Sequence, residues 1–246
     1  MPVVDETSRV LLPLLKILSL ISNPSRGVVV EPDFSTREYG RLESIGGALL
    51  MFGGLIGGAI TLLVDWFRLG RLLKVARTAV IDNAVKRVLY LKTNLWLGVQ
   101  AGGSIAHTAG VIGGLLSRNY GVDFASAEIP VALPKSEALT ILPVKPPPRY
   151  VVPREINHYR HNAIFSKKII GLHSESYGFI YQRLSQGNFT GVILSRRWKL
   201  PLVMEFNGSE AWLSRNWGRP LIFEKLAKMA EETSLRHAHL VVTVSD

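Results

Sequence analysis

Residues 88–122 read VLYLKTNLWLGVQAGGSIAHTAGVIGGLLSRNYGV and contain one strand, one glycine-containing loop and one helix. The run Val88–Leu91 is short, apolar and rich in β-formers, so it predicts a buried strand of a parallel sheet. Gly102 and Gly103 permit a tight turn, and from Ser104 onward apolar residues recur at helical spacing. A helix that starts there directs free N–H groups and a positive dipole end to the space above the strand, where a phosphate can bind. The alternative is a simple tight turn, since the loop lacks the spacing of the dinucleotide and P-loop motifs.

The rest of the chain after residue 86 continues this alternation of strands and helices. We expect further strands at 122–126, 139–144, 178–183, 202–206 and 240–246, and helices at about 103–118, 157–172, 189–198 and 220–238. Such alternation implies crossover connections and a parallel sheet. The predicted fold is therefore α/β, a Rossmann-like domain over 86–246 with flanking helices. The loops 94–104, 183–188 and 207–219 would meet in one crevice at the carboxyl ends of the strands.

The first 85 residues differ in composition and predict a helical, glycine-rich and basic extension. Ile45–Val64 is a stretch of twenty residues without a charge. Its length matches the hydrocarbon core of a bilayer, and the basic residues that follow would keep that side cytoplasmic. Six glycines within it weaken a helix in water but suit close helix packing in lipid. A membrane span, an interfacial or protein-buried hairpin, and a mobile segment all remain open.

Charge indicates an anionic partner. The 246-residue chain has a formal net charge of +10, and the segment 66–87 carries six basic residues against one acid. Nucleic acid, an anionic membrane surface or a phosphorylated substrate would fit. Only Trp66 and Phe67 offer an aromatic platform in this segment, so lipid is favoured over nucleic acid; the alternative is a solvated face of a packing helix. Asp5 and Glu6 precede the first apolar run, which argues against a cleavable signal peptide.

Several side chains in the predicted crevice suit carbohydrate and phosphate. The loop 207–218 combines amide, hydroxyl, carboxylate and indole groups, a mixture common in sugar sites; its members are Asn207, Gly208, Ser209, Glu210 and Trp212. The alternative is a surface loop with Trp212 tucked into the core. Arg183 would bind phosphate or carboxylate, or form a structural salt bridge. His107 would line the mouth of the phosphate pocket or pack on a helix face.

Other chemistries find little support. The chain has no cysteine, which excludes disulfides and thiolate metal sites. The pairs His158/His161 and His237/His239 lack an accompanying carboxylate motif, so we expect no metal. There is no G-x-S-x-G elbow and hence no indication of a hydrolase triad.

The order of motifs resembles a known family. These motifs are the AGGS loop followed by HTAGV, the FIYQR strand, the LPLV strand, the NGSEAW loop and the closing RHAHLVVTVS. Together they resemble the N-terminal domain of family-4 (group 1) retaining glycosyltransferases of the GT-B type, over about residues 86–246.

The resemblance implies a nucleotide-sugar donor as substrate and no resident cofactor. It places Gly102, Gly103 and Ser104 at the donor diphosphate, and His107, Arg183 and residues 207–212 at the acceptor or sugar. Asn207 stands where the family usually has a histidine, and an amide cannot exchange a proton near neutral pH. The catalytic residues therefore stay unknown.

The family's C-terminal domain with its E-x7-E motif has no counterpart before Asp246. We therefore expect the acceptor-side half of a glycosyltransferase, inactive alone, at the cytoplasmic face of a membrane and acting on a glycolipid or polysaccharide precursor. Two other functions stay open. One is an NAD-type oxidoreductase in which Glu128 binds a ribose. The other is a non-catalytic module that binds membrane or nucleic acid through its basic segment.

Overall fold

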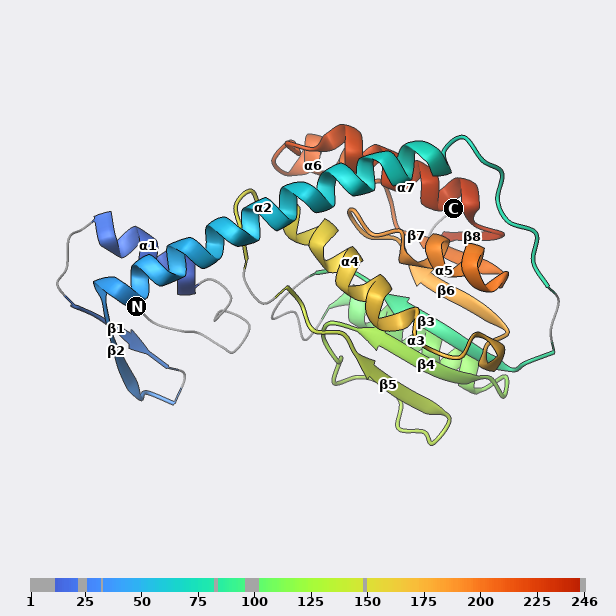
Figure 1. The fold of residues 1–246 in the computed structure, drawn as a ribbon. Coiled ribbons are helices and arrows are strands. Elements are labelled where there is room, and N and C mark those ends of the chain that lie inside the picture. Colours follow the sequence, from blue (N-terminus) through green and yellow to red (C-terminus); the bar gives the residue numbers. More distant parts are fainter. Residues whose placement is uncertain are drawn as a thin grey trace.

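The computed structural model describes residues 12–21, 26–31, 33–81, 84–95, 102–147 and 150–243 (Figure 1). Its elements are α1 (Leu12–Ile21), β1 (Arg26–Val30), β2 (Thr36–Gly40), α2 (Arg41–Leu72), β3 (Arg87–Lys92), α3 (Gly103–Leu116), β4 (Gly121–Ser126), β5 (Leu139–Pro143), α4 (Ile156–Ile169), a 3-10 helix (Ser174–Ser176), β6 (Phe179–Arg183), α5 (Thr190–Trp198), β7 (Leu202–Phe206), α6 (Glu210–Trp217), α7 (Glu224–His237) and β8 (Leu240–Thr243).

Six strands form one sheet in the order β5-β4-β3-β6-β7-β8, and every neighbouring pair is parallel. The predicted Rossmann-like α/β fold is confirmed. The chain winds outward from β3 to one edge and then returns to start β6 on the other side of β3. The order therefore reverses between β3 and β6, and in such sheets ligands bind beyond the carboxyl ends of the strands at this point.

Helices cover both faces of the sheet, and a further helix forms an outer layer. On one face, α3 packs Ile112 against Val88 and Phe124 of the strands. On the other, α4, α5 and α7 bury the larger core around Leu89, Phe165 and their neighbours. Helix α2 lies outside this layer, along α4 and α7 (Figure 1).

Helix α2 is a single helix of 32 residues. It joins the uncharged stretch predicted from the sequence to the first part of the basic segment. The N-terminal extension is helical as expected, but it also contains the antiparallel hairpin of β1 and β2, which was not predicted. Helix α1 packs along the N-terminal part of α2 (Figure 1).

A narrow stripe of α2 is buried. The buried positions recur mostly every seven residues and are Ser44, Met51, Gly58, Asp65 and Leu69. A seven-residue spacing is two helical turns, so these side chains share one face. At the crossing with the start of α4, a Cβ atom on Gly58 would lie 2.3 Å from Cγ2 of Ile156. The glycine thus permits close helix packing within the protein.

Three predictions at the C-terminal end need correction. The segment expected as the loop 207–218 contains helix α6. Helix α7 begins at Glu224 rather than at Pro220. Strand β8 was expected to be buried, but Leu240–Thr243 is exposed, because β8 is the edge strand and no described helix covers it. Residues 244–246 of that predicted strand lie outside the described residues.

Candidate functional site

A row of polar residues crosses the carboxyl edge of the sheet. Parallel register places Ser126 of β4, Lys92 of β3, Arg183 of β6 and Glu205 of β7 side by side. All four are buried or nearly so. Charged residues are rarely buried unless they are paired or functional. The row lies at the edge where the strand order reverses. We therefore take this edge as the candidate functional site.

Glu205 is the centre of this row, and its side chain is fully buried. Its carboxylate accepts hydrogen bonds from the Tyr181 hydroxyl at 2.9 Å and from the Asn207 amide at 2.7 Å. An Arg183 nitrogen and Nε2 of His107 each lie 3.3 Å from the same oxygen, Oε1. Three parts of the chain, namely α3, β6 and the loop after β7, thus supply partners for one carboxylate.

Lys92 adds a second buried cation, 4% exposed, next to Arg183 in the row. Burial lowers the pKa of Lys92, and the charge of Arg183 lowers it further, while Glu128 opposes the shift. Two cations held out of water at one sheet edge would gain from an anionic ligand, because the ligand's charge would offset their mutual repulsion.

The N-terminus of α3 meets this row. Gly102 has φ +128°, a conformation that favours glycine, and it precedes the first turn of the helix. Arg183 donates to the carbonyl of Ser104 at 3.4 Å, which ties the strand end to that turn. The Ser104 hydroxyl is buried without a hydrogen-bond partner among the described residues. Residues 96–101 of the predicted glycine loop lie outside the described residues.

A polar cavity of about 190 Å³ lies nearby at the same edge. It lies between the end of β3, the segment leading into α4, the β6–α5 loop and α6; its lining residues are Asn94, Leu95, Tyr150, Arg154, His158, Ser185, Gln186, Glu210 and Ser214. Oδ1 of Asn94 and Nε2 of Gln186 are buried without partners in the described part of the chain. They offer an acceptor and a donor to a polar ligand.

Charges in the cavity are shifted by burial. Burial raises the pKa of Glu210, the charge of Glu231 raises it further, and Arg183 opposes this. Burial lowers the pKa of His158 to about 4, helped by the charge of Arg154, so His158 is neutral near pH 7. Neutral imidazole can both donate and accept a hydrogen bond.

The cavity and the charged row are connected through the ends of β3 and β6. The Thr93 hydroxyl lies 2.7 Å from the Ser185 hydroxyl and 3.3 Å from the carbonyl of Arg183. Ser185 lines the cavity, whereas Arg183 belongs to the row. The two parts therefore flank one point where the strand order reverses.

The structure brings together most of the residues proposed from the sequence. Six of them lie around Glu205 or at the start of α3: Gly102, Gly103, Ser104, His107, Arg183 and Asn207. Glu210 lies in the cavity instead. The other three, Gly208, Ser209 and Trp212, lie at the start of α6 or in it.

Gly208 has φ +113° and precedes Ser209, whose hydroxyl accepts from the backbone N–H of Trp212 and so caps α6. Trp212 is 52% exposed and packs against Trp217, so it is not tucked into the core.

Sequence reasoning missed Lys92, Glu205, Arg154 and His158 as site residues. Glu205 had a recognisable signal, a carboxylate inside the apolar run 202–206. The remaining histidines have structural partners: Nε2 of His237 lies 3.0 Å from the Leu72 carbonyl and Nε2 of His239 lies 3.0 Å from the Thr78 carbonyl. Within the described ranges, no group of three or more histidine and acidic side chains is placed to hold a metal ion.

Comparison with known proteins adds no family. No protein-family model matches the chain, and no curated protein matches it. The fold and the geometry of the site therefore carry the functional argument.

Proposed function

We propose that this chain is the acceptor-side half of a glycosyltransferase that uses a nucleotide-sugar donor. The observation that carries the proposal is the pairing of two compartments at one sheet edge. One is a sugar-sized polar cavity, and the other is a charged row at a helix N-terminus. The family resemblance of residues 86–246 supports the same function.

The cavity suits one sugar ring. Its volume of about 190 Å³ corresponds to roughly six water molecules at about 30 Å³ each, well below the roughly 300–1,000 Å³ of sites for drug-sized ligands. Amide, hydroxyl, carboxyl and imidazole groups line it, and these bind sugar hydroxyls. A whole nucleotide sugar would not fit, so the cavity is assigned to the acceptor.

The charged row suits the donor diphosphate. Lys92 and Arg183 supply positive charge, and the first turn of α3 supplies backbone N–H groups and the dipole. Glu205 holds Arg183 in place and leaves less than full charge compensation for the two cations. The remaining donor contacts would come from the second domain of a GT-B enzyme.

The oxidoreductase alternative fits less well. Glu128 does follow β4, the second strand of the sheet, where a ribose-binding acid would stand. However, ten residues, 93–102, separate the last residue of β3, Lys92, from the first residue of α3, Gly103. Dinucleotide folds instead use a short glycine turn there, so that the helix directly follows the strand.

Sugar binding tests the acceptor half of the proposal. The purified chain is mixed with a panel of methyl hexosides, and saturation-transfer NMR reports binding. We expect at least one hexoside to bind, and Glu210→Gln together with Ser214→Ala to weaken binding about tenfold or more, because the first replaces a carboxyl oxygen with an amide nitrogen that only donates and the second removes a hydroxyl from the cavity. Glu175→Gln serves as the matched control, because Glu175 is an exposed acid that does not line the cavity. No binding by any hexoside would overturn the acceptor assignment.

Pyrophosphate tests the donor half. Isothermal titration should detect pyrophosphate binding that Arg183→Gln weakens about tenfold, whereas Arg118→Gln at an exposed helix end has no effect. Equal affinity in the Arg183 variant would show that the charged row does not bind the diphosphate.

A further inference from the structure

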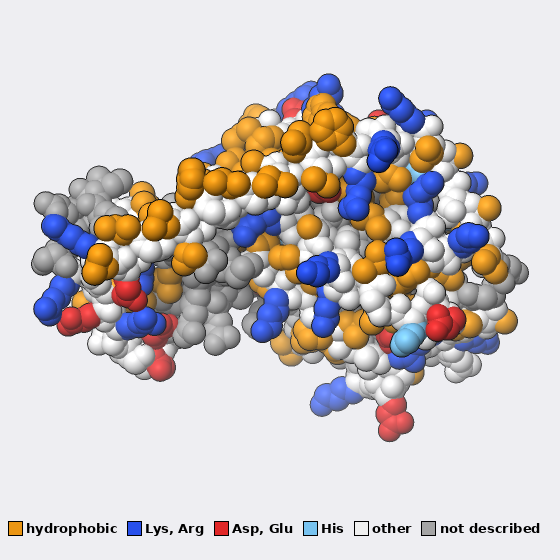
Figure 2. Space-filling model, in the orientation of Figure 1, with side chains coloured by type: hydrophobic (Ala, Val, Ile, Leu, Met, Phe, Trp, Pro, Cys, Tyr) orange, Lys and Arg blue, Asp and Glu red, His pale blue; other side chains and the backbone are white. Residues whose placement is uncertain are grey.

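The outward face of α2 is apolar and exposed. Its members are 49–68% exposed and are Ile45, Leu49, Phe52, Ile56, Ile60, Leu63 and Phe67. Their spacing of three and four residues places them in one stripe, opposite the buried stripe that packs on the protein. Figure 2 shows the hydrophobic atoms as a row along α2. We call these seven residues the outer stripe.

The surroundings of the outer stripe do not suit another helix as partner. A helix pair in water covers a narrow seam and keeps charged residues on both flanks. Here no charge occurs from Ile45 to Val64, and the flanking Leu50 and Val64 are themselves half exposed. A second helix would leave these flanks in water, whereas a lipid surface would cover the stripe and its flanks together.

Exposed aromatic side chains extend this surface beyond α2. Trp66 lies under Nζ of Lys225 at 5.0 Å from the ring centroid, which joins α2 to the first turn of α7. Trp212 and Trp217 of α6 pack edge to face with ring centroids 5.2 Å apart, and Trp217 is 78% exposed. Tryptophan is enriched where proteins meet the headgroup region of a bilayer.

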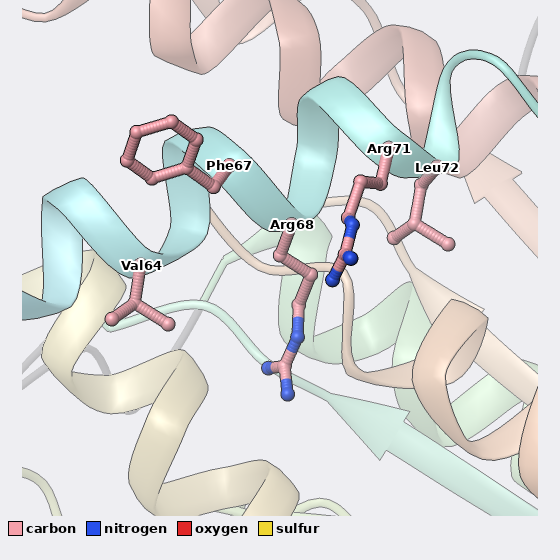
Figure 3. Close-up of a pocket in the computed structure, with 5 residues that line it drawn as sticks. All are labelled: Val64, Phe67, Arg68, Arg71 and Leu72. Atoms are coloured by element: carbon pink, nitrogen blue, oxygen red, sulfur yellow. The ribbon is translucent and has the colours of Figure 1, made fainter.

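Basic residues stand at the C-terminal end of the outer stripe. Residues 66–81 carry four basic residues and no acid. Arg68 and Arg71 point the same way into a hollow of about 700 Å³ that Val64, Phe67 and Leu72 also line (Figure 3). Two guanidinium groups beside apolar side chains suit a phosphate joined to an acyl chain.

The packing of α2 shows how it can meet a bilayer. Asp65, 2% exposed, and Gly58 are buried against the α/β domain in the C-terminal half of the helix, and α1 covers part of the N-terminal half. A span needs about 20 residues with apolar surroundings on all sides. By length and hydropathy α2 is the one described helix that could cross a membrane, and it is largely exposed, yet its narrow buried stripe is held against the protein.

We propose that the outer stripe, together with Trp212 and Trp217, binds an anionic lipid bilayer, with α2 lying in the plane of the interface. Helix α2 then acts as a monotopic anchor rather than as a span. This geometry exposes the apolar stripe to acyl chains while Arg68 and Arg71 reach the headgroups.

The anchor lies close to the acceptor cavity. Val151 packs on Gly54 of α2, while the adjacent Tyr150 lines the cavity. Ile156 at the start of α4 packs on Gly58 in the same way. One segment therefore lies between α2 and the cavity. If the proposed glycosyl transfer holds, on which this step rests, the acceptor is an amphiphile whose sugar reaches the cavity while its lipid stays in the bilayer.

Vesicle flotation tests the surface without any sugar. The full chain is mixed with vesicles of phosphatidylcholine containing phosphatidylglycerol and floated on a density gradient. The triple variant Leu49→Gln, Phe52→Gln, Ile56→Gln should bind at least about tenfold more weakly, because three side chains lose their burial in lipid. The control Ile129→Gln, Val131→Gln changes exposed apolar residues away from α2 and should bind like the parent chain. Circular dichroism verifies that the variants fold.

Two other outcomes would overturn the proposal. One is a stable dimer in analytical ultracentrifugation that the triple variant dissociates, without vesicle binding by the parent chain; the stripe would then bind a second copy. The other is equal flotation of parent and triple variant. Neither measurement involves hexosides. A failure of vesicle binding therefore leaves the sugar-binding result unchanged, and a failure of sugar binding leaves the vesicle-binding result unchanged.

Protease access separates the in-plane anchor from a span. Trypsin added outside sealed vesicles with bound chain should cleave at both exposed Arg37 and exposed Lys135, which precedes Ser136. These sites lie on either side of α2 in the chain, so an in-plane helix leaves both on the outer surface. Protection of one of them until detergent is added would show that α2 spans the bilayer.

Discussion

At the scale of single residues, Glu205 joins the parts of the site. Its carboxylate contacts side chains from α3, β6 and the loop after β7. Removing one partner of a buried ion pair leaves the other charge uncompensated. The free-energy cost of that uncompensated charge exceeds the stabilisation that the intact pair contributes. A substitution of Glu205 is therefore the most informative test of the interactions that hold the site together.

We expect Glu205→Ala to lower the free energy of unfolding by about 3 kcal/mol, because it leaves the buried Arg183 without its counter-charge. Urea unfolding measures the change. Glu232→Ala is the control, since Glu232 forms an exposed pair with Arg236 and its loss changes stability by about 0.5 kcal/mol or less. Equal effects of the two substitutions would contradict a buried ion pair.

Asp65 gives a second residue-scale prediction. Burial raises its pKa from 3.8 to about 7, while Arg68 and a hydrogen bond with Asn162 oppose the shift. The folded state therefore keeps a proton that the unfolded state loses above about pH 4. Stability falls as pH rises from about 4 to about 7 and then levels, by at most on the order of 4 kcal/mol for about three pKa units.

Asp65→Asn should remove this dependence, because an amide does not ionise. Thermal unfolding at pH 5 and pH 8 compares the two proteins. We expect the parent chain to lose more stability between these pH values than the variant does. Tyr159 also faces Asp65, but its pKa is raised well above this window, so it does not titrate there. An equal loss in both proteins would assign the effect to other groups.

The sequence predicted some of these residues and not others for a physical reason. Ser104, His107 and Arg183 stand next to a glycine turn or a strand end, and both features are local. Lys92 and Glu205 join them only through the register of three strands that are far apart in the chain. That register depends on packing of the whole sheet, so no local pattern contains it.

At the scale of elements, α2 contains two adjacent glycines, Gly57 and Gly58, whose surroundings differ. A Cβ atom at Gly58 would lie 2.3 Å from Ile156, whereas at Gly57 it would meet no atom within 4 Å. Gly58→Ala should therefore destabilise the protein by about 1–3 kcal/mol through overpacking. Gly57→Ala should be neutral or stabilise by up to about 1 kcal/mol, because alanine favours the helix. Denaturant unfolding of both variants checks this, and a shared sign would contradict the crossing of α2 on α4.

Helix α6 is an element that was not predicted from the sequence. Asn207, Gly208 and Ser209 favour turns, and the helix that follows has only eight residues, so composition predicted a loop. The local signal was Ser209 followed by acidic Glu210, an N-cap and an acid in the first turn. The 14-residue helix α3 was predicted because its apolar periodicity persists over more turns.

At the scale of the whole molecule, alternation of strands and helices sufficed to predict a parallel sheet. The order in which the strands pair was not predictable, since it depends on where each crossover returns. The hairpin of β1 and β2 was missed because its strand Thr36–Gly40 has mostly polar, exposed residues and little apolar alternation. The order matters most for function, because its reversal places the cavity and the charged row at the same edge.

The charge distribution of the whole molecule leads to the last prediction. Its net charge of +10 would attract any anionic surface, whereas the proposed anchor requires charge at one place. Arg68→Gln with Arg71→Gln, in the hollow beside the outer stripe, should weaken binding to phosphatidylglycerol-containing vesicles about thirtyfold, at about 1 kcal/mol for each of the two basic residues near the surface. Binding to phosphatidylcholine alone, through the apolar stripe, should stay unchanged.

Lys167→Gln with Lys168→Gln removes the same charge from exposed positions at the end of α4 and is the matched control. It should retain the affinity of the parent chain for both kinds of vesicle. Raising the salt concentration should then erase the difference between the two double variants, because screening weakens the headgroup contacts of Arg68 and Arg71 in the parent chain and the control alike. If both double variants lose affinity equally at low salt, net charge alone draws the chain to the membrane, and α2 has no special place in it.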